Sequence, residues 1–222
     1  MYFVTGVLWL HDQLFEGTNV VINKLIELGK RVYFVTNNNQ TSRAEIATKC
    51  LKMNFALDQF SMITSSYVTA QFVKESEIKK VYLIGSKALA QELELVTNVI
   101  GNGPDLMTNT LPDYVKAELP RMDREVEAVV VGFDEHFSFP KLFKAVNYLR
   151  NPSVKFIATN GDEKIDFPQF TFPDAGPIVA AIENATQKKA VVVGKPSKHV
   201  TNIALKHEAH VDPNRFMVIG DR

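Results

Sequence analysis

Three short segments carry side chains that could act on a phosphate group. Thr36, Asn37 and Asn38 follow an apolar run, and they offer hydroxyl and backbone N–H donors to an anion. Lys195, in a Gly-Lys-Pro-Ser segment, supplies an ammonium group that can neutralise a phosphate or an attacking carboxylate. Asp221, in a Gly-Asp-Arg segment, supplies a carboxylate of the kind that binds magnesium together with waters and phosphate oxygens.

Each segment also has an interpretation that requires no ligand. The three residues after the apolar run could form an Asx-rich turn. Lys195 could be a solvated loop lysine, and Asp221 could cap a helix or close a turn. The residue types alone leave both interpretations open. The choice between them depends on whether the strands and helices bring these residues together.

Six short apolar runs end in Gly, Asn, Asp or Thr, and continuous Val/Ile/Phe runs of this length are typical of strands buried on both faces of a parallel sheet. The predicted strands cover residues 32–35, 81–84, 128–131, 155–158, 190–193 and 216–219. Ligands bind outside the carboxyl ends of such strands. The three segments are therefore expected to converge at one edge of a sheet.

Segments with helical patterning alternate with these runs and cover residues 18–28, 41–53, 141–149 and 177–185. This alternation predicts an α/β fold, a doubly wound parallel sheet with right-handed crossovers. Residues 98–124, rich in Gly, Pro, Asn and Asp, are expected to form a long surface connection. Residues 161–177 are irregular and could form a hinge between two units.

The composition excludes several classes of protein. Lys+Arg and Asp+Glu both number 25 among 222 residues, which argues against binding to nucleic acid or to an anionic membrane through bulk charge. Cys50 is the only cysteine, so neither an internal disulfide nor a cysteine zinc site can form. The sequence shows no signal peptide and no apolar stretch of about 20 residues. A reduced, cytoplasmic protein is the default expectation.

Five motifs together resemble the haloacid dehalogenase-like phosphatases. They are GVLWL at 6–10, GKRVYFVTNN at 29–38, VVGFDEHFSFPKL at 130–142, VVGKPS at 192–197 and IGDR at 219–222. The detail is similar to the pyridoxal phosphate and phosphoglycolate phosphatases, formerly called para-nitrophenylphosphatases. The resemblance covers nearly the whole chain.

The resemblance implies a Rossmann-like core with an inserted α/β cap: core residues 1–78, cap residues 79–175 and core residues 176–222. It also implies hydrolysis of small phosphate monoesters, in which an aspartate attacks phosphorus and forms an aspartyl-phosphate. A second aspartate acts as acid and base, and Mg²⁺ offsets the charge on phosphate and nucleophile. Relatives often pair through the cap, so a homodimer formed through the cap is a further expectation.

The resemblance also assigns roles to individual residues. Thr36, Asn37 and Asn38 would cradle the phosphate, Lys195 would bind both the phosphate and the nucleophile, and Asp221 would be a magnesium ligand. The expected partner is a small phosphorylated metabolite, with no nucleic acid and no membrane.

The chain departs from the family pattern at the catalytic aspartates. In an ungapped alignment Phe3 occupies the nucleophile position and Thr5 the acid/base position, and a gapped alignment leaves both aspartates missing. Asp12 is the nearest carboxylate, and we expect it on a surface loop. Relatives also have Pro-Gly-Thr-Gly where this chain has a segment that includes Asp174.

These departures predict a chain that is inactive or severely impaired, with weak magnesium binding, because removing a nucleophile lowers rates by orders of magnitude. One hypothesis is that the chain is an incomplete product of a gene for an active enzyme, truncated after Arg222. The alternative is a pseudophosphatase that binds a phosphometabolite or a protein partner without turnover. A generic nucleotide-binding domain is disfavoured, because no glycine-rich nucleotide loop is present.

Overall fold

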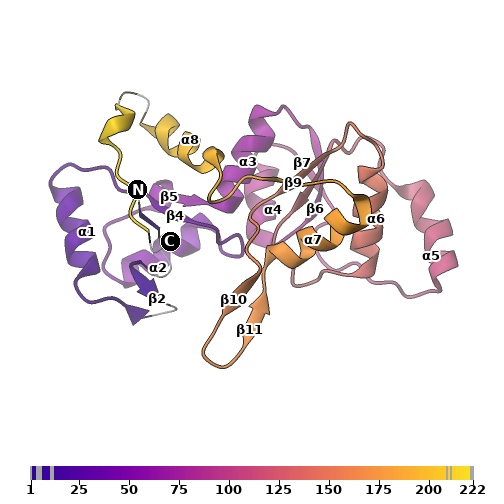
Figure 1. The fold of residues 1–222 in the computed structure, drawn as a ribbon, viewed down its shortest axis with the longest axis horizontal. Helices are drawn as coiled ribbons and strands as arrows, with labels where there is room; N and C mark the ends of the chain where they lie inside the picture. The colour runs from indigo at the N-terminus through magenta and orange to yellow at the C-terminus, as the bar shows by residue number, and fades with distance from the viewer. Residues whose placement is uncertain (1, 4–6, 11–12, 209, 211, 221–222) are drawn as a thin grey trace.

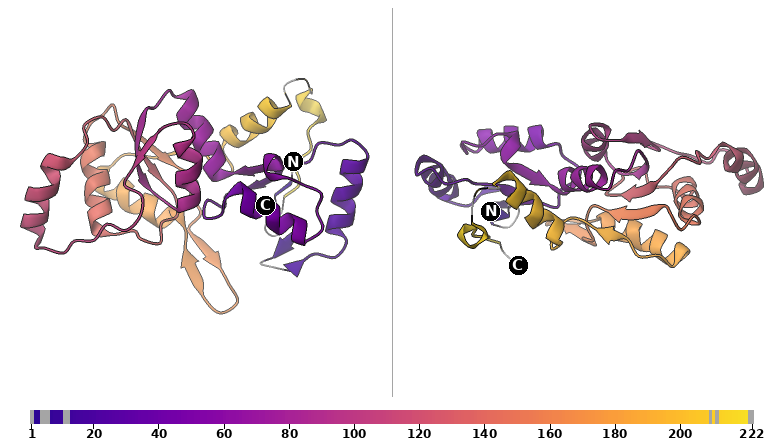
Figure 2. Two further views of the ribbon diagram at one scale, coloured as in Figure 1. Left: turned by 180° about the vertical axis from the view of Figure 1, so that it is seen from behind. Right: turned by 90° about the horizontal axis from the view of Figure 1, so that it is seen from above.

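Two parallel β-sheets lie side by side along the long axis of the molecule (Figures 1 and 2). The computed structural model describes residues 2–3, 7–10, 13–208, 210 and 212–220. The predicted α/β class with parallel strands is confirmed. No helix in the described part of the chain has both the length and the apolar character needed to cross a membrane.

The smaller sheet has the order β1-β4-β5, with strands Tyr2–Phe3, Phe34–Thr36 and Met62–Thr64. Helices α1 (Thr18–Glu27) and α2 (Arg43–Lys52) belong to the same part of the chain. Ser42 caps α2 in a capping box with Glu45, which satisfies N–H groups at the helix start. A short antiparallel pair, β2 (Trp9–Leu10) and β3 (Gln13–Leu14), precedes α1.

The larger sheet has the order β12-β9-β8-β6-β7, and all its strands are parallel. The strands are Val191–Val192, Lys155–Ala158, Ala128–Val131, Lys80–Ile84 and Asn98–Ile100. Alternate side chains of the central strands enter two different apolar clusters, so both faces of the sheet are covered. This explains the continuous apolar runs in the sequence.

Helices cover this larger sheet on two sides. Helices α3 (Ser65–Glu75) and α4 (Lys87–Glu94) contribute to one cluster, and α6 (Phe139–Leu149) and α7 (Ala175–Thr186) to the other. The remaining helices are α5 (Leu111–Glu118) and α8 (Lys198–His207), with short 3-10 turns at Gln59–Ser61, Leu119–Arg121 and Pro213–Arg215.

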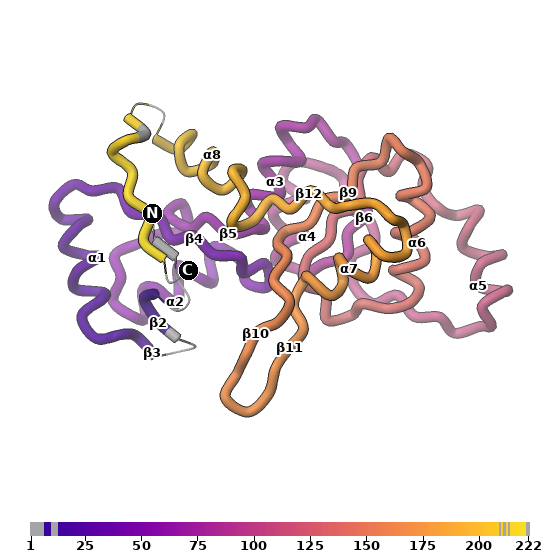
Figure 3. Tube along the Cα trace, viewed as in Figure 1, coloured from indigo at the N-terminus to yellow at the C-terminus, as the bar shows by residue number. Residues whose placement is uncertain are grey.

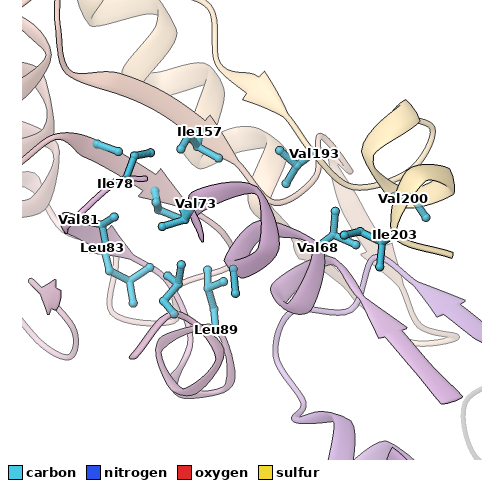
Figure 4. Packing of buried hydrophobic residues seen from close by; sticks show 14 of the residues in the cluster. Val68, Val73, Ile78, Val81, Leu83, Leu89, Ile157, Val193, Val200 and Ile203 are labelled. Carbon is cyan, nitrogen blue, oxygen red and sulfur yellow. The ribbon is translucent and has the colours of Figure 1, made fainter. Parts of the chain in front are cut away.

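Helix α3 joins the two sheets through one hydrophobic core (Figure 4). Val68 and Val73 of α3 pack in the same cluster as Val35 and Ile63 of the smaller sheet. That cluster also holds residues of the larger sheet and of α8, among them Leu83, Val130, Ile157, Val200 and Ile203. The two sheets therefore share buried surface.

The domain division at residues 79 and 175 stays a prediction, but the larger sheet does not end at residue 175. Helix α7 packs with α6 and β8, and β12 pairs with β9 before the chain continues to α8 (Figure 3). Segment 175–192 thus adds a helix and an edge strand to the larger sheet.

Two of the segments predicted from the sequence differ in the structure. Residues 216–219, predicted as a strand, form none in the described chain, and Met217 is 70% exposed. A buried parallel strand needs cover on both faces, and this run lacks it. The predicted surface connection at 98–124 contains β7 and α5, where Thr110 caps the helix.

The irregular segment 161–177, which could form a hinge, contains an antiparallel hairpin, and its hinge role stays a prediction. Its strands are β10 (Lys164–Asp166) and β11 (Thr171–Pro173), and it projects from the body of the molecule (Figure 1). The rings of Phe167, Phe170 and Phe172 contact one another at its tip, with Phe167 and Phe170 stacked at a centroid distance of 4.8 Å. Mutual ring packing explains how so irregular a sequence holds a defined shape.

Phe34 of β4 is fully buried, and its ring contacts Phe55 at 5.3 Å and Trp9 at 5.8 Å. We expect Phe34→Ala to lower the free energy of unfolding by about 3–5 kcal/mol, because it removes a buried ring and leaves a cavity. Chemical denaturation measures this loss. Phe60→Ala is the matched control: Phe60 is 66% exposed, and its loss should cost less than about 0.5 kcal/mol. Equal losses in both variants would contradict the packing.

Candidate functional site

The loop after β4 is shaped by its own polar side chains. The N–H of Asn38 donates to the Thr36 hydroxyl at 3.1 Å. The side-chain oxygen of Asn38 accepts the N–H groups of Gln40 at 2.8 Å and Thr41 at 3.1 Å. The Asx turn weighed as the alternative is therefore present, and it leads directly into the cap of α2. This turn does not exclude a ligand at the same loop.

Asn37 brings this loop against the Gly-Lys-Pro segment. Its side-chain oxygen accepts the backbone N–H of Lys195 at 2.8 Å, and its amide nitrogen donates to the carbonyl of Lys195 at 3.3 Å. The hydroxyl of Ser65, at the start of α3, donates to the carbonyl of Asn37 at 2.7 Å. The structure thus brings together two of the segments that the sequence analysis singled out.

Gly194 makes this close approach possible. A Cβ atom at this position would lie 2.2 Å from the carbonyl oxygen of Thr159 and 2.8 Å from the side-chain oxygen of Asn37. Its N–H donates to the same Thr159 carbonyl at 2.7 Å. Only glycine allows the end of β12 to lie so near the end of β9.

The sequence analysis missed a set of polar residues at this junction. Asn39, Asn160 and Asp162 were not singled out, and Asp174 was noted only as a departure from the family pattern, although the Thr-Asn-Gly-Asp segment after residue 158 is one of the polar strand ends. The Asn39 amide donates to the side-chain oxygen of Asn160 at 2.9 Å. Its own oxygen accepts the N–H of Phe133, in the loop after β8, at 2.9 Å.

Asn160 links two carboxylates. Its amide nitrogen donates to Asp162 at 3.0 Å and to Asp174 at 3.2 Å. Asp162 also accepts from the side-chain amide of Asn37 at 2.9 Å. We call Asn37, Asn39, Asn160, Asp162 and Asp174 the polar network. It connects the end of β4 in the smaller sheet with the ends of β8 and β9 in the larger one.

Asp174 is the most perturbed acid of this network. It is 7% exposed, and one of its carboxylate oxygens is buried without a hydrogen-bond partner. Burial raises the pKa of Asp174 above its ordinary value, and the negative charge of Asp162 adds to this rise. The nearby backbone N–H of Ala175 and the side-chain amide of Asn160 oppose this rise in pKa without cancelling it.

Of the two positions expected for the catalytic aspartates, the described residues include only Phe3. Phe3 belongs to β1, and its backbone pairs with Val35 of β4, one residue before Thr36. The nucleophile position is thus adjacent in the sheet to the proposed phosphate loop. Thr5, Asp12 and Asp221 lie outside the described residues.

The described residues were expected to include few magnesium ligands, because the one assigned from the sequence was Asp221. Among them, no group of three or more His, Cys, Asp or Glu side chains could hold a metal ion. The magnesium ligand expected at Asp221 is not among the described residues.

The whole chain matches known haloacid dehalogenase-like hydrolases. Residues 4–97 and residues 63–222 each match a family with that description. The chain therefore belongs to the haloacid dehalogenase-like hydrolases. Within them it falls in the subgroup of the para-nitrophenylphosphatases and phosphoglycolate phosphatases, as the sequence motifs indicated.

Three known proteins illustrate the similarity. The chain is 34% identical to human glycerol-3-phosphate phosphatase, over 98% of this chain and 70% of the relative. It is 27% identical to the 4-nitrophenylphosphatase from Thermotoga maritima, with a TM-score of 0.82 and coverage of 100% and 77%. A glycerol phosphate phosphatase from Mycobacterium tuberculosis, solved in complex with magnesium, shares the fold at 22% identity and a TM-score of 0.78, with coverage of 100% and 60%.

We expect Gly194→Ala to destabilise the fold by more than about 1 kcal/mol, because the added Cβ would collide with the Thr159 backbone. Chemical denaturation measures the change. Gly161→Ala is the matched control, since a Cβ at Gly161 meets no atom within 4 Å. A Gly194→Ala variant as stable as the Gly161→Ala variant would show that the two strand ends do not approach as described.

The raised pKa of Asp174 predicts a pH-dependent stability. The folded chain holds the proton of Asp174 more tightly than the unfolded chain, so this stabilising contribution is complete below the unfolded pKa of about 3.9. It is lost as pH rises through the folded pKa. Asp174→Asn has no such titration, so its melting temperature should rise relative to the original chain between these two pKa values. Thermal unfolding at a series of pH values tests this; a difference that stays constant with pH would refute it.

Proposed function

We propose that this chain binds the phosphate group of a small phosphate monoester between the loop Thr36–Asn38 and Lys195, with hydrolysis absent or severely impaired. The observation that carries the proposal is the pair of hydrogen bonds between the Asn37 side chain and the Lys195 backbone, one donated by each residue. They hold the hydroxyl and backbone donors of one loop next to the lysine of the other.

The residues supply recognition rather than covalent chemistry. The Thr36 hydroxyl and the backbone N–H groups at the strand end offer neutral donors. The Lys195 ammonium supplies the positive charge that a phosphate dianion requires. Hydrogen bonds to charged groups contribute more than those between neutral groups, so several convergent donors suffice for binding.

Turnover is the step that this chain lacks. The family reaction requires an aspartate to attack phosphorus and a second aspartate to transfer protons, and Phe3 and Thr5 stand at these positions. Neither a phenyl ring nor a threonine hydroxyl replaces a carboxylate in both roles. The chain is thus proposed to act as a phosphate-monoester binder, as a pseudophosphatase would. Magnesium binding is proposed to be weak, and pairing through the cap remains a proposal.

We expect no magnesium-dependent release of phosphate from para-nitrophenyl phosphate. A colorimetric assay for nitrophenolate measures it, with Thr36→Ala as the control variant. Turnover by the original chain that Thr36→Ala abolishes would overturn the proposal that catalysis is lost, because the activity would then belong to this site.

Binding is tested separately by isothermal titration calorimetry. We expect heat on titration with phosphoglycolate, pyridoxal phosphate or glycerol 3-phosphate, the last taken from the name of the human relative. Lys195→Ala should weaken this binding by about tenfold or more, because it removes a charged donor. Lys189→Ala, an exposed lysine elsewhere on the chain, is the matched control. A folded chain that gives no heat, or undiminished binding by Lys195→Ala, would contradict the proposed site.

A further inference from the structure

Asp174 stands at the first residue before α7, where an aspartate normally caps the helix with its own side chain. Here it makes no side-chain cap hydrogen bond to the helix. Its carboxylate accepts instead from the side-chain amide of Asn160, at 3.2 Å. The side chain is therefore directed to the polar network rather than to the backbone of α7.

Burying this carboxylate costs free energy, and its hydrogen bonds do not offset that cost. One oxygen has a single donor, and the other is buried with no partner. A buried acceptor without a partner is destabilising, and a second negative charge, on Asp162, lies nearby. Acids in such settings are candidates for a functional role, because packing alone would favour a neutral side chain.

The hydrogen bonds lead from Asp174 toward Lys195. Asn160 uses one amide hydrogen on Asp174 and the other on Asp162, so the position of one carboxylate orients the group that binds the other. Asp162 then holds the side-chain amide of Asn37. Asn37 binds both the N–H and the carbonyl of Lys195. The orientation of the Asn37 side chain therefore determines the position of the Lys195 backbone.

Hydrogen bonds hold the side-chain amide of Asn160 through both its oxygen and its nitrogen. Its oxygen accepts from both Asn39 and Thr159, so the amide plane is anchored on that side. The backbone of Asp162 is held as well, because the N–H of Gly176 donates to its carbonyl at 2.8 Å. On the nitrogen side of the amide, the carboxylates of Asp162 and Asp174 are the two acceptors, and Asp174 is the buried one.

We propose that Asp174 is a positioning residue for Lys195. Its buried carboxylate orients Asn160, and the orientation passes through Asp162 and Asn37 to the lysine backbone. This inference deepens the proposed function and rests on it, because Lys195 is there the phosphate-binding residue. Asp174 itself touches no ligand in this account.

Hydrogen exchange of the Lys195 amide tests the positioning without any ligand. That amide donates to Asn37, so it should exchange at least about tenfold faster in Asp174→Ala, which removes the acceptor for Asn160. Asp174→Asn keeps an oxygen acceptor and should preserve the protection. The amide of Val130, in the centre of the larger sheet, reports global unfolding. Its exchange rate should not rise by the same factor as that of Lys195.

Binding of inorganic phosphate, measured by calorimetry, gives the second readout. Asp174→Ala should weaken it by about tenfold, Asp174→Asn should leave it near the original value, and the exposed control Asp166→Ala should not change it. If the original chain binds no phosphate, the proposed function fails, and the exchange experiment still decides the positioning. If Lys195 exchanges equally in all variants, or only in step with Val130, the positioning role is refuted.

Discussion

The arrangement depends on amide side chains at the junction of the two sheets, of which Asn39 and Asn160 are buried and must satisfy their hydrogen bonds, while Asn37 is half-buried. Asn37, Asn39 and Asn160 lie where the ends of three strands meet, and their amides donate to and accept from residues far apart in the sequence. Burying such groups without partners would cost several kcal/mol, on the order of 1–3 for each unpaired group. The loops can therefore adopt few arrangements, and the one that satisfies these amides places Asn37 beside Lys195.

Much of the fold could be predicted from the sequence because parallel strands buried on both faces leave a clear pattern. The runs at Ala128–Val131 and Lys155–Ala158 coincide with β8 and β9, and Ser42 with Glu45 marks the start of α2. Helix α3 was missed, because it is buried on several sides and mixes serine, threonine and aromatic residues without a single apolar stripe. The hairpin of β10 and β11 was missed because its strands are short and exposed, and because ring contacts among phenylalanines add to its backbone pairing.

The candidate site was predictable only where a residue type has a distinctive chemistry. Lysine after Gly and before Pro, and a hydroxyl followed by amides at a strand end, are such signals. Asp162 and Asp174 carried none, because an aspartate in a loop most often caps or closes a turn. Their significance arises from a partner, Asn160, whose hydrogens reach both carboxylates. That relation depends on how β9, the hairpin and α7 are placed in space, which residue spacing does not encode.

Helix α3 contributes one set of side chains to a core that both sheets share. A loss of packing at Val68 or Val73 would therefore expose apolar surface on each sheet at once, so neither sheet can melt while the other keeps its full burial. Such coupling makes the two sheets a single cooperative unit despite their separate hydrogen-bond ladders. Unfolding of this shared core would accordingly also separate the strand ends that the amide junction connects.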